Sequence, residues 1–254
     1  MADFSSICYK NNYLIEVVAR MDFLEEAKCL SGKVLPGEVH EAIKKRYDIY
    51  EPSTGRIQGV QITDKGVSTQ HEEFQQWTFH GAEREKTINI SKNDVNVSLK
   101  KYNNYNDLKN DVIEPISSIQ SLERDAHISR TGLRYINIFD GLISSTEEIR
   151  TFFSPMLSGQ FSELYEKENC SRSFLITEYI YGEIKIRMQT GIYNPDYPAR
   201  MKKLDFIIDI DAYVDTPHVF SDVNAIFDEL HKKIQMHFES SITETMREHL
   251  HERA

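Results

Sequence analysis

The sequence predicts an α+β fold in which mostly antiparallel sheets carry helices packed on one face. Three observations support this class. Strand-like segments outnumber helical ones, and many are neighbours along the chain, which favours antiparallel pairing. Several of them alternate apolar and polar residues, so that each has one face suited to a core. Helical spacing of apolar residues appears at 105–123 and again from Ser221 onward.

The first strand is predicted at 13–23. Its apolar face consists of Ile15, Val17, Ala19, Met21 and Phe23. A short helix is expected from Pro36, because proline suits the first turn and basic residues end the segment. A stretch at 53–66, punctuated by glycine, predicts an exposed strand between turns. A separate strand at 73–81 contains Trp77.

Two strands and a helix complete the first half. Segments 86–91 and 95–102 flank Lys92, Asn93 and Asp94, a composition typical of a hairpin turn. The helix at 105–123 contains Pro115. Because proline donates no backbone hydrogen bond, we expect it to kink the helix or to shorten its first part.

The second half begins with a strand at 128–139, followed by a helix that Ser145 or Thr146 is expected to cap. A tight hairpin around Gly182 and a long strand at 203–215 come next.

Two helices end the sequence. Ser221 is expected to open a long amphipathic helix. Ser241 and Glu244 are spaced as a capping box for a last, short helix, which we expect to dock weakly or on a partner. An isolated helix of that length is not stable without tertiary contacts.

The order of strand, helix, strands and helix thus occurs twice. It suggests a duplicated unit with pseudo-repeats at 1–126 and 127–254. No linker-like composition separates them. The chain is therefore expected to form a single domain, 1–254, in which both halves share one core.

Composition and charge narrow the function classes. The 254 residues carry a formal net charge of −10, which disfavours general nucleic-acid binding because phosphate backbones repel an acidic protein. The three cysteines form no closely spaced pair, as expected in a reducing compartment. No signal-peptide pattern and no apolar run of about 20 residues is present. We expect a cytoplasmic protein without a membrane segment.

Charged residues follow the strand period at four places, and we assign the candidate binding site to them. In the strand at 203–215 the acidic face and the apolar face are cleanly separated by residue parity. The acidic face holds Asp205, Asp209, Asp211 and Asp215. Basic residues share one face of two other strands: Lys185 with Arg187, and Arg130 with Arg134. The strand at 13–23 adds Glu16, Arg20 and Asp22.

The signs of these charges are complementary, so neighbouring strands would set acids against bases. Such cross-strand pairs contribute about 0.2–1 kcal/mol each. We expect Arg134 to pair with Asp209 or Asp211, because a guanidinium holds a carboxylate with two parallel bonds. Three interpretations stay open: a salt-bridged sheet face exposed to water, a polar groove that receives a ligand, and a divalent-metal site at Asp209 and Asp211.

The strand at 128–139 raises a further question, because it contains several polar residues within an apolar pattern. Gly132 permits close approach of another group. Asn137 is expected at the end of the strand, where its side chain would satisfy turn groups. We include Asn137 among the candidate binding residues, which are Arg130, Arg134, Asn137, Lys185, Arg187, Asp209 and Asp211.

The same strand carries a resemblance to a known family. Arg130, Gly132, Leu133, Arg134, Tyr135 and Asn137 match an R-x-G-L-R-Y-x-N motif. The chain resembles a sporadically distributed prokaryotic family of uncharacterised proteins of about 250 residues. The early strand, the aromatic strand and the C-terminal helix resemble the family more weakly. The resemblance implies no established activity, and the family's patchy distribution is similar to that of phage-defence and toxin–antitoxin genes.

Function therefore remains open between three classes. A non-catalytic binding or assembly protein of a prokaryotic accessory locus leads, with self-association or a protein partner, the C-terminal helix being one candidate surface. Nucleic-acid or nucleotide recognition through the arginine-bearing sheet face comes second. A metal-dependent phosphoryl-transfer enzyme using Asp209 and Asp211 comes last. No cofactor motif is recognisable in the sequence.

Overall fold

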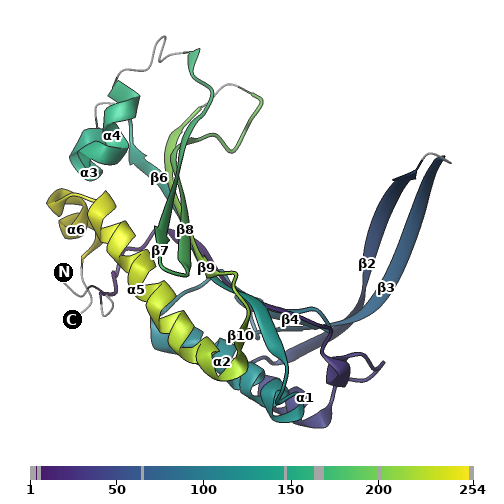
Figure 1. Ribbon diagram of the computed structural model, residues 1–254. Coiled ribbons are helices and arrows are strands. Elements are labelled where there is room, and N and C mark those ends of the chain that lie inside the picture. Colours follow the sequence, from purple (N-terminus) through teal and green to yellow (C-terminus); the bar gives the residue numbers. More distant parts are fainter. Residues whose placement is uncertain are drawn as a thin grey trace.

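A computed structural model describes residues 4, 7–63, 66–145, 148–162, 169–199 and 202–251; within them, the side chains of 53–74, 160 and 162 lie outside the description. The expected α+β class is confirmed (Figure 1). One antiparallel sheet has the strand order β2-β3-β4-β5-β1-β6-β9-β8-β7, and β10 pairs with β6 off this path. The strands are β1 Leu14–Phe23, β2 Ile49–Thr63, β3 Gly66–His80, β4 Lys86–Ser91, β5 Asp94–Leu99, β6 His127–Ile143, β7 Ser173–Tyr181, β8 Ile184–Tyr193, β9 Leu204–Val214 and β10 His218–Val219.

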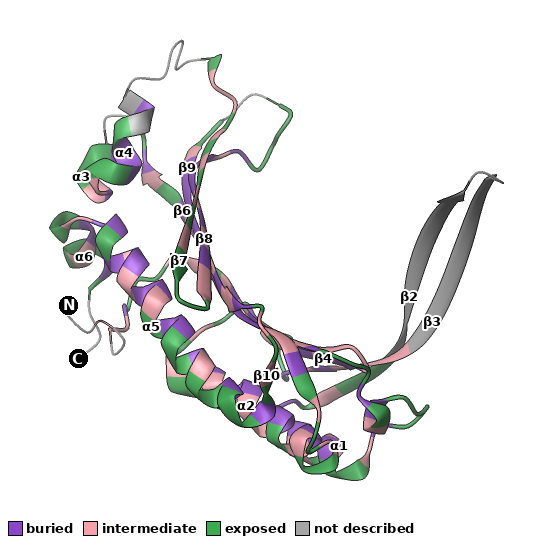
Figure 2. Ribbon diagram, in the orientation of Figure 1, coloured by how far each residue is buried: buried purple, intermediate pink, exposed green. Residues whose placement is uncertain are grey.

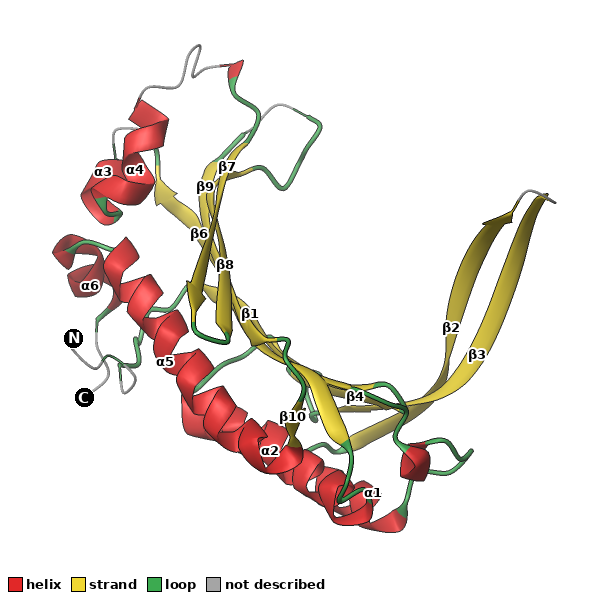
Figure 3. Cartoon of the chain, in the orientation of Figure 1, coloured by secondary structure: helices red, strands yellow, loops and turns green. Residues whose placement is uncertain are grey.

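The helices lie on one side of this sheet (Figure 3). They are α1 Gly37–Lys44, α2 Tyr105–Leu122, α3 Ile149–Phe152, α4 Pro155–Ser162, α5 Val223–Ser241 and α6 Glu244–Leu250, with short 3-10 turns at Lys28–Leu30 and Phe220–Asp222. Figure 2 shows buried residues on the strands and on the helix surfaces turned toward them. Among the described residues, one hydrophobic cluster contains members of both halves, from Tyr9 to Leu250.

The two halves meet at the centre of the sheet. β1 pairs with β5 on one side and with β6 on the other. β6 in turn pairs with β9. Each half thus places its first strand beside the strand that precedes its long helix. This is the arrangement that a duplicated unit would produce, and the duplication itself stays a prediction.

Pro115 does not shorten α2, which runs from Tyr105 to Leu122, so that part of the expectation is wrong; a kink at Pro115 stays a prediction. Proline at this position leaves the carbonyl of Asp111, four residues earlier, without its helical donor. The Tyr47 hydroxyl, 3.4 Å away, donates a hydrogen bond to that carbonyl. A tertiary contact therefore replaces the missing backbone bond.

The segment at 53–81 also differs from expectation. The strand predicted at 53–66 and the Trp77 strand belong to one long hairpin, β2 and β3, which are paired from Ile49 with His80 to Thr63 with Gly66. The expected exposure of 53–66 lies outside the described side chains. β3 pairs with β4 only through Gln76–His80 among the residues whose pairing is described. The outer part of the hairpin therefore extends beyond the rest of the sheet (Figure 1). Glycines at 55 and 59 resemble turn signals but lie within β2.

The last helix is packed into the chain's own core. α5 continues to Ser241, so the expected capping box there is wrong; Thr243 caps α6 instead, its Oγ1 accepting a hydrogen bond from the Met246 amide. Met246 and Leu250 are buried. The apolar stripe that we expected to dock weakly or on a partner is thus already covered by this chain.

A buried carboxylate ties α6 to the N-terminal segment. Glu239, on α5, is 1% exposed. Its two carboxylate oxygens accept hydrogen bonds from the Tyr9 hydroxyl at 2.8 Å, from the Gln235 amide at 3.3 Å and from Arg247 Nε at 2.9 Å. Arg247 also donates to the Glu239 carbonyl. Three separate segments are therefore fixed to one another at this point.

Two further features are the absence of a membrane-spanning helix among the described residues and the state of the cysteines. In the described ranges, none of the helices has the length and apolar character needed to cross a membrane. Cys8, Cys29 and Cys170 are all free thiols.

Candidate functional site

The sheet has a second face, which we call the open face because no described helix lies on it (Figure 3). The sheet curves, with the helices along its outer side and the open face on its inner side (Figure 1). The four strands with charged faces, β1, β6, β9 and β8, are consecutive neighbours in the sheet. The prediction that acids and bases meet across adjacent strands is confirmed by the pairs described below.

Arg134 and Asp209 form a bidentate ion pair on this face. Arg134 Nε lies 2.7 Å from Asp209 Oδ1, and Nη2 lies 2.5 Å from Oδ2. The two parallel bonds confirm the predicted partner. The Asp209 side chain is 5% exposed and that of Arg134 is 44% exposed, so the arginine covers the acid. This hydrogen bonding raises the pKa of Arg134.

Arg130 and Asp211 form a second, longer ion pair between β6 and β9. Arg130 Nη2 lies 3.3 Å from Asp211 Oδ2, and the guanidinium stacks over the Tyr213 ring at 4.6 Å. Burial raises the pKa of Asp211 although Arg130, Arg134 and Arg187 all oppose the shift. A Cβ atom on Gly132 would lie 3.3 Å from Arg130 Nη1. Glycine at this position therefore leaves room for the arginine to cross the strand.

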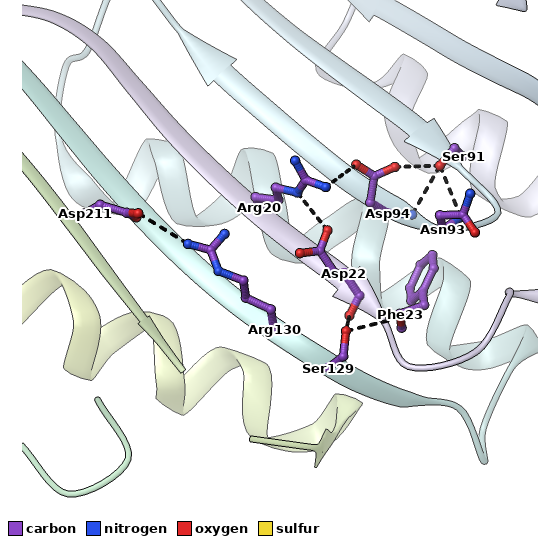
Figure 4. A network of polar contacts seen from close by, with 9 residues as sticks. All are labelled: Arg20, Asp22, Phe23, Ser91, Asn93, Asp94, Ser129, Arg130 and Asp211. Atoms are coloured by element: carbon purple, nitrogen blue, oxygen red, sulfur yellow. Dashed lines mark hydrogen bonds and ion pairs between the residues drawn. The ribbon is translucent and has the colours of Figure 1, made fainter. Parts of the chain in front are cut away.

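On β1, which lies on the side of β6 opposite β9, Arg20 bridges two carboxylates. Its Nε lies 2.7 Å from Asp22 Oδ1 and its Nη2 lies 3.4 Å from Asp94 Oδ2 (Figure 4). Ser91 Oγ donates to Asp94 at 2.5 Å and closes the turn between β4 and β5. Ser129 Oγ donates to the backbone carbonyls of β1. The polar groups at this end of the face are thus engaged with one another.

β8 supplies the remaining predicted cations. Lys185 Nζ lies 2.8 Å from Asp215 Oδ2, and both side chains are well exposed. Arg187 lies opposite Asp211 on one neighbouring strand and opposite Glu178 on the other. In the described part of the chain, Arg187 joins none of the ion pairs. Its charge acts on Asp211, whose pKa it lowers, but no described carboxylate lies within ion-pair distance of it.

Asn137 does not belong with these residues. It lies in the middle of β6 rather than at its end, which corrects the expectation. It is buried on the helix side of the sheet, and its Nδ2 donates to the Ile208 carbonyl at 3.4 Å. It lines a cavity of about 60 Å³ together with Tyr135 and Gln235. That volume holds a few water molecules, far less than the several hundred Å³ of usual ligand sites.

Sequence reasoning missed a pocket at one end of the open face. Asp205 is 5% exposed, and its Oδ1 has no hydrogen-bond partner among the described residues. Burial, followed by the nearby Asp140, raises its pKa. The pocket measures about 440 Å³, and its apolar lining includes Ile15 and Tyr193. Residue parity placed Asp205 on this face, but its burial depends on the loop that follows β8.

Ile15 reaches that pocket because a register shift in β1 between Leu14 and Glu16 turns it out of the predicted apolar face. Its side chain is 46% exposed. The hydrophobic pattern contains no signal for such a bulge.

The edge of the open face carries an apolar row that the sequence analysis did not single out. Phe174, Ile176 and Ile180 on β7 are 37%, 50% and 73% exposed. Each lies opposite a residue of β8 that faces the same side as Lys185 and Arg187. The sequence of β7 is nearly apolar throughout, which predicts a strand buried on both faces. The exposure of Phe174, Ile176 and Ile180 could therefore not be predicted from it.

The chemistry available on this face is recognition by charge and shape. Asp209 and Asp211 are each bound by an arginine, and among the described residues no three metal-ligating side chains are grouped to hold a metal ion. The positive charges of Arg130 and Arg134 are compensated locally, so they are not offered as a phosphate-binding stripe.

Comparisons with protein-family models, with curated proteins and with solved structures find no match to this chain.

Proposed function

We propose that this chain is a non-catalytic binding or assembly protein that receives a protein partner on the charged centre of its open face. The observation that carries the proposal is Arg187. It is partly exposed on a face whose other arginines, Arg130 and Arg134, are held by aspartates. A cation surrounded by fixed charges needs little reorganisation to accept a carboxylate from outside.

The neighbours of Arg187 support this role. Tyr213 presents an aromatic ring beneath Arg130, and aromatic and arginine side chains are enriched at protein interfaces. Glu178 is exposed beside Arg187. An acidic group of the partner would meet Arg187, while its basic groups would meet Glu178.

A comparison of two single substitutions tests the proposal. Arg187→Ala removes one positive charge from the open face, and Lys232→Ala removes one from the exposed side of α5. Tagged wild-type and variant chains are used for capture from the native host, with quantitative mass spectrometry. We expect partners of the wild type to be lost with Arg187→Ala and kept with Lys232→Ala. Equal capture by all three chains would refute the role of this face.

We further propose that the protein works in a reducing, cytoplasmic compartment. We propose that its gene belongs to a prokaryotic accessory locus of the phage-defence or toxin–antitoxin kind. The three free cysteines support the first part, and the motif of β6 supports the second. Thiol counting on denatured protein without reductant should find all three thiols. Gel shifts with random DNA and RNA at physiological salt should be negative; a tight, salt-sensitive shift would instead favour nucleic-acid recognition.

A further inference from the structure

β7 ends the sheet on the side opposite the long hairpin, and β8 is its partner strand within the described path. Its pairing with β8 runs from Ser173 to Tyr181 without a register shift. Edge strands usually avoid further pairing through proline, lysine, bulges or short length. The strand sequence SFLITEYIY contains neither proline nor lysine. β7 is therefore a smooth edge on which another strand can be added.

The outer strand at the other end differs in this respect. β2 contains Pro52, and proline cannot donate to a further strand. An unprotected edge is thus found at β7 and not at both ends of the sheet.

The side chains of β7 are complementary to a second copy of the same strand. Antiparallel pairing about a two-fold axis at Thr177 sets Phe174 opposite Ile180 of the partner subunit, twice. It also sets Ile176 opposite Glu178 of the partner subunit, so the glutamates do not lie opposite each other. Moving the axis to Glu178 would place the two glutamates opposite each other, which is destabilising. The axis at Thr177 therefore brings apolar side chains together and keeps the two glutamates apart.

We propose that two copies of this chain pair through β7 in antiparallel fashion, with the two-fold axis at Thr177. A two-fold interface uses the same patch on both subunits, as this register does. The two sheets become one, and the open faces of both copies lie on the same side. Phe174 of each copy then contacts Ile180 of the partner subunit across the new strand pair, which covers part of the exposed apolar row. This proposal is independent of the partner proposed for Arg187.

A disulfide test addresses the register. In a background with Cys8, Cys29 and Cys170 changed to serine, Thr177→Cys places two sulfurs across the two-fold axis, where directly opposite Cβ atoms lie roughly 4.5–5.5 Å apart. Leu175→Cys is the matched control, because residue 175 lies opposite Tyr179 of the partner subunit. We expect a cross-linked dimer on mild oxidation with Thr177→Cys only. Equal cross-linking of both variants, or of neither, would overturn the proposed register.

Sedimentation analysis addresses the association itself. Ile180→Lys introduces a charge at the edge, and Val34→Lys does so at a side chain that is 81% exposed elsewhere in the chain. We expect wild type and Val34→Lys to dimerise at micromolar concentration, and Ile180→Lys to raise the dissociation constant roughly tenfold or more. Circular dichroism checks that all three chains are folded. A monomeric wild type at about 100 µM, or an unchanged dissociation constant for Ile180→Lys, would refute pairing through β7.

Discussion

Arg134 and Asp209 share two hydrogen bonds, but water reaches them unequally. Asp209 is nearly covered, whereas almost half of the Arg134 side chain is exposed. Removal of either partner therefore has different consequences. Without Arg134, a buried carboxylate loses its counter-charge, which is costly. Without Asp209, the arginine can turn into water.

We expect Arg134→Ala to lower the free energy of unfolding by about 2–3 kcal/mol, and Asp209→Ala to lower it by about 1 kcal/mol. The double variant should lose less than the sum, because the second substitution removes a group that the first has already left unpaired. Urea melts of the four chains measure these values. If the two single variants lose equal free energy of unfolding and the double variant loses their sum, the interaction between Arg134 and Asp209 contributes nothing to stability.

This pair also shows what the sequence can predict. Residue parity and charge sign placed Arg134 opposite the acidic strand because a strand has a strict two-residue period. Asn137 follows the same parity rule, on the helix side, but its polarity favoured a strand end. Its actual partner is a carbonyl of the neighbouring strand. The Asp205 pocket could not be predicted, because its burial depends on how the loop between β8 and β9 packs against residues of β1 and β6, which no strand pattern reveals.

Asp205 offers a test by pH. Its pKa is raised in the folded chain, by burial first, so the folded state binds this proton more readily than the unfolded state. Stability linked to this group is therefore highest at low pH and falls as pH rises above the ordinary aspartate range near about 3.9. Asp205→Asn removes the charge, and its amide can donate to Asp140.

We expect Asp205→Asn to raise the free energy of unfolding at pH 7 by about 1 kcal/mol. The gain should vanish as the pH falls below about 4. Asp215→Asn is the control, because Asp215 pairs with Lys185 and its substitution should bring no gain. Thermal or urea unfolding across pH 3–8 decides the matter. A loss of stability of Asp205→Asn at pH 7 would mean that the charged carboxylate of Asp205 stabilises the fold and would contradict this prediction.

At the scale of elements, local patterns identified most strands and helices but not how they end. The hairpins at Gly182 and at 92–94 were predicted because short turns leave a composition signal. The cap at Thr243 was not, because Ser241, the serine of the apparent capping box, is the last residue of α5, while Glu244 is the first residue of α6. α6 then docks by Met246 and Leu250, a contact that a short helix pattern does not reveal.

The docking of α6 can be measured directly. Met246 is fully buried, so Met246→Ala should lower the free energy of unfolding by about 2–5 kcal/mol through the lost contacts and the cavity left behind. Glu248→Ala, on the exposed side of the same helix, should change it by less than about 0.5 kcal/mol. Chemical denaturation provides both values. A Met246→Ala variant as stable as wild type would return α6 to the role of a weakly docked segment.

At the scale of the whole molecule, the two halves depend on each other. β1 and β6 form a long antiparallel seam, and one hydrophobic cluster spans both halves. Separate expression of 1–126 and 127–254 should therefore give chains without cooperative unfolding. Mixing them should restore a cooperative transition. Far-UV circular dichroism during thermal melts is the measurement. Cooperative unfolding of either fragment alone would show two independent domains.

The seam also has a consequence for synthesis on the ribosome. β1 emerges before β5 and β6, and one of its edges can pair with β5 as soon as β5 has been made. Its other edge must wait for β6, which follows α2. During that interval the nascent sheet presents an unpaired strand to every neighbouring chain. Pairing of distant segments is slow, so the pace of translation beyond α2 sets how long this exposure lasts.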